Sequence, residues 1–141
     1  MTDDTVGAVR ESAPSGRETA DFVQVKMPAE SAYLSVLRTA TAGLAARLDF
    51  TVDEIEDLRI AIDEACAMLL AQAIPGTDLE CVFELGPDQV TITVSVTAAE
   101  PKMPPRDTFA WTVLSALAGT VDSTVGPDDR VSIVLAKRRG G

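Results

Sequence analysis

The segment from Thr51 to Ile74 constrains the fold of this chain most, because it predicts one long amphipathic helix with a defined start. Thr51 is followed three residues later by Glu54, the capping-box spacing in which each side chain bonds the other residue's backbone at a helix N-terminus. Apolar residues then recur at helical spacing and form one stripe: Ile55, Leu58, Ile62, Ala65, Cys66, Leu69 and Ala73. Pro75 and Gly76 end the predicted helix.

Alternating apolar and polar residues predict several strands elsewhere in the chain. The predicted strands span residues 23–27, 79–85, 90–97, 121–125 and 130–137. Gly-Pro-Asp sequences at 86–88 and 126–128 are typical of tight turns. We therefore expect the last four strands to form two antiparallel hairpins.

Two further helices and one loop are predicted from spacing and from proline content. Residues 29–48 carry apolar side chains at helical spacing, and residues 108–119 read as a short apolar helix capped by Thr108 or Asp107. The stretch 98–107 contains three prolines in ten residues, which excludes both a helix and an inner strand. It is therefore predicted to be a loop.

These elements predict an α+β fold, a two-layer sandwich in which three helices cover one face of a mostly antiparallel sheet. At 141 residues the chain suits a single domain, placed at residues 21–138. Residues 1–20 lack apolar periodicity and are predicted to form a disordered tail. Because the last helix is apolar almost all round, Phe109 and Trp111 are expected in the core.

Composition excludes several classes of function. The chain has no histidine, which rules out imidazole-based triads and the usual zinc sites, so no metal ligand set is expected. A net charge of −10 argues against binding to nucleic acid or to an anionic membrane surface. The same charge suits a basic protein partner or serves solubility alone.

Two other sequence features bear on the cellular environment. Cys66 and Cys81 fall among apolar residues of a predicted helix and a predicted strand, so we expect buried, reduced thiols rather than a disulfide. The first residues lack the apolar core of a signal peptide, and no run approaches the roughly 20 apolar residues that span a bilayer. A cytoplasmic location is expected.

This order of elements, with IEDLRIAIDEAC on the long helix, resembles the RsbW-like anti-sigma factors and serine kinases of the GHKL ATPase superfamily. The similarity covers roughly residues 21–138 and is strongest over VKMPAESAYLSVLRTATAGLAARLDFTVDEIEDLRIAIDEAC. The resemblance implies a histidine kinase-like ATPase fold.

The resemblance also identifies candidate residues for an ATP site. In that family, a Glu on this helix positions or activates the acceptor hydroxyl, and an Asn four residues later binds Mg²⁺. Glu64 matches the Glu and is the candidate catalytic residue, whereas Met68 stands at the Asn position. Mg²⁺ prefers oxygen ligands, so a thioether is a poor replacement. Glu64 and Met68 thus mark degenerate cofactor-binding positions.

Two further ATP-binding motifs of the family are missing from the matching positions. The family's Asp-x-Gly, which reads adenine, corresponds to residues 97–101, where there is neither Asp nor Gly. The Gly-x-Gly run that exposes backbone N–H groups to phosphates corresponds to residues 108–111, Thr-Phe-Ala-Trp. ATP and Mg²⁺ are implied by the resemblance, but these substitutions predict that no cofactor is bound.

The resemblance further implies protein partners. Members of the family hold a sigma factor away from RNA polymerase and release it when an anti-anti-sigma antagonist takes its place. The contact falls mainly on the exposed side of the first helix, where Arg38 matches a partner-binding arginine, with Tyr33 and Arg47 as further candidates. Family members form homodimers, and the first strand is expected to be a sheet edge available for pairing.

The leading hypothesis is an anti-sigma factor that regulates transcription by sequestering an alternative sigma factor. The first alternative is an ATP-dependent serine/threonine kinase that phosphorylates the antagonist through Glu64. The second is a scaffold that senses a small ligand in a remodelled ATPase pocket.

Overall fold

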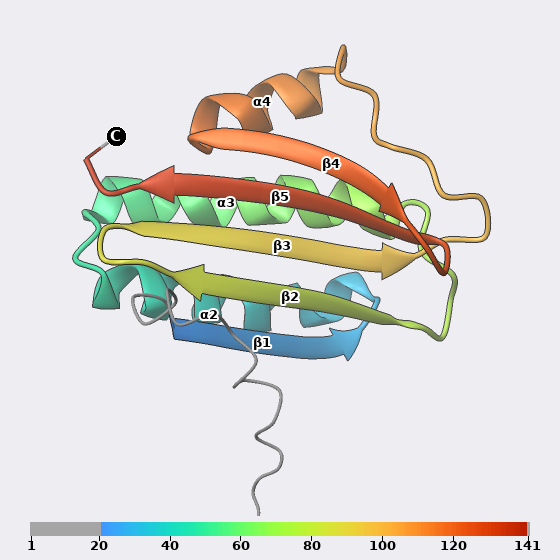
Figure 1. The fold of residues 1–141 in the computed structure, drawn as a ribbon, viewed down its shortest axis with the longest axis horizontal. Helices are drawn as coiled ribbons and strands as arrows, with labels where there is room; N and C mark the ends of the chain where they lie inside the picture. Colours follow the sequence, from blue (N-terminus) through green and yellow to red (C-terminus); the bar gives the residue numbers. More distant parts are fainter. Residues whose placement is uncertain (1–20, 141) are drawn as a thin grey trace, which may run out of the picture.

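The computed structural model describes residues 21–140, so the predicted tail at residues 1–20 lies outside the described residues. The described chain runs through β1 (Asp21–Pro28), the 3₁₀ turn η2 (Ser31–Tyr33), α2 (Leu34–Arg47), α3 (Val52–Leu70), β2 (Asp78–Leu85), β3 (Gln89–Thr97), α4 (Phe109–Leu117), β4 (Thr120–Gly126) and β5 (Arg130–Arg138) (Figure 1). All predicted strands and helices are present, with some boundaries shifted.

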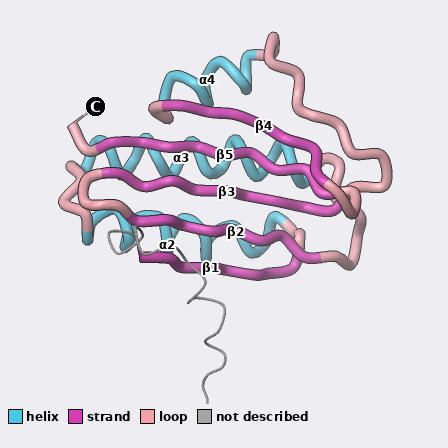
Figure 2. Tube along the Cα trace, in the orientation of Figure 1, coloured by secondary structure: helices cyan, strands magenta, loops and turns pink. Residues whose placement is uncertain are grey.

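Within residues 21–140 the strands form one five-stranded sheet in the order β1-β2-β3-β5-β4. Every neighbouring pair is antiparallel. The three α-helices lie on one side of the sheet, and the other side carries no helix of the described chain (Figures 1 and 2). The predicted α+β two-layer fold is confirmed, and β1 is an edge strand as expected.

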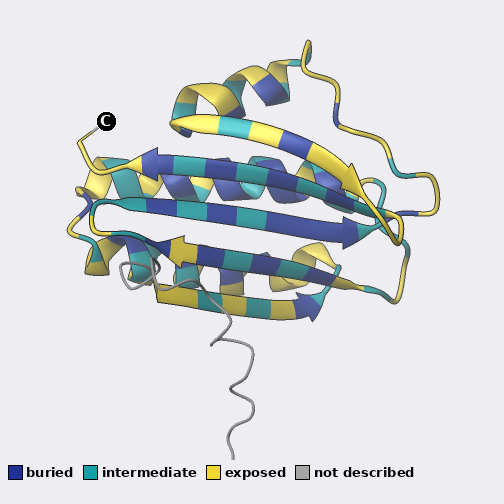
Figure 3. Cartoon of the chain, in the orientation of Figure 1, coloured by how far each residue is buried: buried dark blue, intermediate teal, exposed yellow. Residues whose placement is uncertain are grey.

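The core lies between the sheet and the helices, and strand alternation decides which side chains enter it. Figure 3 shows the resulting alternation of buried and more exposed positions along β2, β3 and β5. The fully buried large side chains of the core are Leu37, Leu58, Ile62, Leu69, Leu79, Phe83, Val90, Ile92, Val94, Leu114, Ile133 and Leu135. Helix α3 runs through the centre of this layer and contributes more of them than the other helices do.

Helix α3 begins as predicted and ends earlier than predicted. The Thr51 hydroxyl accepts from the Glu54 backbone N–H at 3.1 Å, and the Glu54 carboxylate accepts from the Thr51 N–H at 2.8 Å. The helix stops at Leu70, because the next residues pair with the end of β3. There the Ile74 N–H donates to the Thr97 carbonyl at 2.9 Å, and this pairing replaces the last predicted helical turn.

The first helix is also shorter than predicted. Residues 31–33 form a 3₁₀ turn, so α2 begins only at Leu34. At its other end, Asp49 adopts the left-handed conformation with φ of 63°, which terminates the helix.

At α4, Thr108 and not Asp107 is the cap, since its hydroxyl accepts from the Trp111 N–H at 3.2 Å. Trp111 is buried as predicted. The prediction for Phe109 is wrong: its side chain is 83% exposed, because α4 buries the side that carries Trp111 and Leu114, and Phe109 lies on the other side of the helix.

The two cysteines are buried free thiols, which confirms the prediction from their surroundings. The pKa of Cys66 is raised to about 12, mainly by burial and to a smaller extent by the neighbouring Asp63 carboxylate, against a lowering by Arg38. Burial also raises the pKa of Cys81. Both thiols are therefore protonated and unreactive at neutral pH.

Candidate functional site

Helix α3 carries candidate residues on two of its sides. Glu64 is half-buried, and within residues 21–140 its carboxylate takes part in no hydrogen bond or ion pair. Met68 follows at a spacing of four, which places it on the same side of the helix. Its side chain is half-buried and packs against the hydrophobic core. Met68 therefore fills space as a core residue does.

The other positions implied by the ATP-site resemblance are occupied by internal contacts. The Thr108 hydroxyl accepts a hydrogen bond from the Trp111 N–H in the first turn of α4, and the Phe109 side chain lies at the start of that helix. At the position that corresponds to the adenine-reading motif, the Ala98 N–H donates to the Asp129 carbonyl at 3.0 Å, and Ala98 forms a β-bridge with Ala73. These backbone groups are engaged with protein.

The loop between β3 and α4 is bound to the turn that follows α3. The Gln72 side chain donates to the Lys102 carbonyl at 2.8 Å and accepts from the Lys102 N–H at 3.0 Å. Further along, Arg106 lies over the Trp111 ring at 4.9 Å and pairs with Asp122 at 2.7 Å. The loop, shown in pink between β3 and α4 in Figure 2, is thus held at both ends.

Together these contacts do not fit Mg²⁺-ATP. A thioether replaces the oxygen ligand at Met68, and the backbone N–H groups of Ala98 and Trp111 already have protein acceptors. Across the described range, no three Cys, Asp or Glu side chains are grouped as a metal site would require. The donors for phosphate and the ligands for magnesium are both poor here.

The opposite side of α3 faces α2 and carries an ion pair. The Arg38 Nε donates to both carboxylate oxygens of Asp63, at 2.8 and 3.0 Å. The side chains of Arg38 and Asp63 are 38% and 37% exposed, so the pair lies at the boundary between the helix layer and solvent. Arg38, the partner-binding candidate on α2, leans toward α3 and keeps part of its side chain exposed to solvent.

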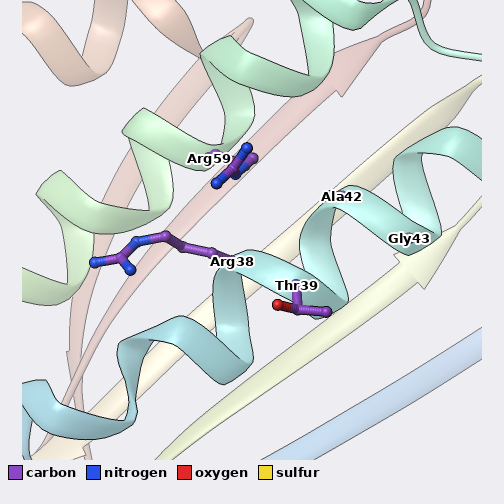
Figure 4. A pocket seen from close by; sticks show the side chains of 5 residues that line it. All are labelled: Arg38, Thr39, Ala42, Gly43 and Arg59. Carbon is purple, nitrogen blue, oxygen red and sulfur yellow. The ribbon is translucent and has the colours of Figure 1, made fainter.

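A groove open to solvent lies beside this ion pair, and we call it the α2–α3 groove. It has a volume of about 460 Å³ and is lined by Arg38, Thr39, Ala42, Gly43 and Arg59. Figure 4 shows Arg59 coming from α3, while the other four residues come from successive turns of α2. Arg59 pairs with Glu56 on its own helix at 2.7 Å. The groove therefore has two guanidinium groups at its margins.

The remaining partner-binding candidates do not join this groove. Tyr33 is exposed and precedes the first residue of α2, whereas Arg47 is exposed in its last turn. Arg47 follows Arg38 by nine residues, which at roughly 100° per residue puts it on the other side of the helix. Of the three predicted residues, only Arg38 lines the groove.

Sequence reasoning missed Arg59 and Asp63. Their spacing of four on a predicted helix shows that they share one side, and this signal is visible without a structure. What the spacing does not reveal is that this side faces Arg38, 25 residues away in the chain from Asp63.

No helix among the described residues is long and apolar enough to cross a membrane.

Comparison with known proteins gives relatives in one group. The chain is 31% identical over 101 residues to the anti-sigma-F factor RsbW of Mycobacterium tuberculosis, covering 72% of this chain and 60% of that protein. It is 40% identical over 63 residues to the serine-protein kinase RsbW of Bacillus pumilus, covering 45% of this chain and 39% of that protein. No protein-family model matches the chain.

The fold has a counterpart among solved structures. A Mycobacterium tuberculosis crystal structure of RsbU and RsbW domains matches 84% of this chain and 32% of that chain, with a TM-score of 0.62 and 14% identity. This likeness supports the fold. These matches confirm the resemblance to RsbW-like proteins, although the chain spans between about two fifths and three fifths of the length of the relatives described above.

Proposed function

We propose that this chain, a relative of the RsbW proteins in sequence and in fold, is an anti-sigma factor that sequesters an alternative sigma factor in the cytoplasm. An anti-anti-sigma antagonist would release the sigma factor by competing for the same surface. The observation that carries the proposal is the contrast between two sides of α3. Arg38 is held at an open groove on one side, while protein atoms occupy the matching ATP positions on the other.

The groove side suits a protein partner for physical reasons. A guanidinium offers several N–H donors in a fixed plane and pairs well with a carboxylate. Arg38 is partly shielded from water by its position between two helices, which strengthens such a pair relative to one on an open surface. The relative from Mycobacterium tuberculosis carries the name anti-sigma-F factor, in agreement with a sequestration role.

The test is direct binding between the purified chain and each alternative sigma factor encoded by its source organism. We expect one sigma factor to bind. Arg38→Glu should weaken that complex at least tenfold, because it places the new glutamate carboxylate against a carboxylate of the sigma factor. Lys102→Glu is the matched control, since it makes the same charge change on the exposed β3–α4 loop, outside the groove. Absence of any sigma-factor complex would refute the proposal, as would equal effects of the two substitutions.

The kinase alternative is favoured by one specific observation. Glu64 is half-buried on α3 with no partner within residues 21–140, so its carboxylate is available to a substrate hydroxyl. The relative from Bacillus pumilus is named a serine-protein kinase. We nevertheless place this activity second, because Met68 supplies no oxygen ligand for Mg²⁺.

Labelled ATP, Mg²⁺ and purified anti-anti-sigma proteins separate the two functions. Sequestration without catalysis predicts no phosphate transfer by the wild-type chain. Transfer that Glu64→Ala abolishes would establish the kinase instead. Met68→Asn restores an oxygen-bearing side chain, and its thermal shift with ATP and Mg²⁺ measures how much of the lost affinity that position alone explains.

We also propose that the chain forms a homodimer, as its first strand offers a route to pairing. β1 is an edge of the sheet, so half of its backbone groups have no partner strand in the described chain. Light scattering at several concentrations should give twice the 14.9 kDa mass of one chain. A single-chain mass at the highest concentration would contradict this.

A further inference from the structure

The Arg38–Asp63 pair uses only part of the guanidinium. Both carboxylate oxygens of Asp63 accept from the same atom, Nε of Arg38. The two terminal nitrogens donate no hydrogen bond to any residue in the described range of 21–140. The terminal edge of Arg38 is therefore left for another acceptor, while the inner edge is fixed.

This arrangement limits the freedom of a long side chain. A free arginine loses rotamer entropy when it is immobilised, and an arginine already held in place loses less on binding. Asp63 comes from the neighbouring helix, so packing of α2 on α3 sets the direction in which Arg38 points. The pair orients Arg38 before any partner arrives.

The opposite margin of the groove supplies a second cation. Arg59 lies one helical turn before Asp63 on α3 and lines the same groove as Arg38. Ala42 and Gly43 also line the groove, and a methyl group built on Gly43 meets no atom within 4 Å. Arg59 is paired with Glu56 through Nη1 alone, so an incoming side chain meets the remaining N–H donors of two guanidinium groups.

We propose that Asp63 is a positioning residue that orients Arg38 for a carboxylate of the bound sigma factor, with Arg59 as the second cation at that contact. This inference rests on the proposed function and names the chemistry of its contact: an acidic side chain that enters the α2–α3 groove. Hydrogen-bond complementarity identifies the occupant, because Asp63 and Glu56 engage only Nε of Arg38 and Nη1 of Arg59 within residues 21–140, and the remaining guanidinium N–H groups are donors that suit a carboxylate.

A purely electrostatic role and a positioning role of Asp63 predict opposite changes in binding affinity when Asp63 is removed. Removing Asp63 raises the local positive charge, so electrostatics alone would tighten binding of an acidic partner. Loss of positioning frees Arg38 to sample other rotamers and weakens the same complex. The sign of the change thus separates the two effects.

The experiment measures dissociation constants for the purified sigma factor that the wild-type chain binds. We expect Asp63→Ala to weaken binding about fivefold to tenfold, and Arg59→Gln to weaken it a few-fold with a shallower salt dependence. Arg38→Gln should have the largest effect. The double variant Arg38→Gln with Asp63→Ala should bind no more weakly than Arg38→Gln alone, because Asp63 acts through Arg38.

Controls and contrary outcomes are distinct. Lys102→Gln removes one positive charge from the β3–α4 loop, outside the groove, and should leave affinity unchanged within twofold. Melting temperatures of all variants monitor folding, and the half-exposed pair is expected to alter them little.

Unchanged or tighter binding by Asp63→Ala, or additive losses in the double variant, would overturn the positioning role while leaving the anti-sigma function intact. Failure of the wild-type chain to bind any sigma factor would overturn both.

Discussion

Gly119 tests how tightly α4 is seated on the sheet. This residue joins the end of α4 to β4, and a methyl group added at its Cα would lie 2.7 Å from the Ala136 carbonyl oxygen. Nearby, the Lys137 Nζ donates to the Leu117 carbonyl at 3.2 Å and binds the last turn of α4 to β5. Ala136 itself pairs with Thr120 across β4 and β5, so its carbonyl is not free to move.

The expected cost of Gly119→Ala follows from these contacts. Forcing an extra methyl into a packed site costs typically about 1–3 kcal/mol, whereas Gly→Ala lowers the entropy of the unfolded chain and returns about 0.4–1 kcal/mol. We expect a net loss of about 1–2 kcal/mol of unfolding free energy. For a domain of this size, that corresponds to a melting temperature lower by roughly 3–10 °C.

Gly43→Ala is the matched control, because the same substitution meets no atom within 4 Å in the interior of α2. It should raise the unfolding free energy by roughly 0.5–1 kcal/mol through helix propensity. Urea unfolding at 25 °C and thermal melts followed by circular dichroism measure both variants. If Gly119→Ala were as stable as Gly43→Ala, the close approach of α4 to β5 would be shown not to constrain the fold.

Three further predictions concern the local structure. Hydrogen bonds from the Thr51 and Gly140 backbones lower the pKa of Glu54 below its ordinary value of 4.5. The ionised carboxylate therefore stabilises the fold above pH 4.5, and this stabilisation is lost as the pH falls through the lowered pKa. Glu54→Gln should therefore lower the melting temperature at pH 7 and reduce the difference in melting temperature between pH 7 and pH 3. If the variant showed the same difference in melting temperature as the wild type, the role of Glu54 would be contradicted. Asp49→Gly should stabilise by about 0.5 kcal/mol in urea unfolding, since glycine adopts φ of 63° without strain, and destabilisation would contradict the reasoning. Phe109→Ser should change the unfolding free energy by less than about 0.5 kcal/mol, whereas Trp111→Ala should cost about 3–5 kcal/mol; similar values for the two would mean that the first turn of α4 is buried after all.

The candidate site was predictable where it depended on spacing within one element. Glu64 and Met68 lie four residues apart, so a helix places them on one side whatever it packs against. Arg38 was identified as a partner-binding candidate from the resemblance, and that role remains a proposal. Helix spacing alone does not indicate that Asp63 and Arg59 lie beside Arg38, because it does not say which neighbouring element a side of the helix faces.

Errors in the sequence predictions have the same origin. Phe109 was expected in the core, but α4 lies at the edge of the helix layer and buries only the side that carries Trp111 and Leu114, so Phe109 on the other side stays exposed. The predicted helix through Ile74 ends at Leu70, because backbone pairing with the end of β3 competes with the final helical turn.

The amino-acid sequence by itself determined the helices, strands and turns of residues 21–140, since capping, apolar periodicity and turn residues act over a few positions. Only the tertiary structure decided the strand order β1-β2-β3-β5-β4 and the meeting of Arg38, Asp63 and Arg59. These depend on which surfaces pack together, and a free-energy balance over distant residues selects that packing.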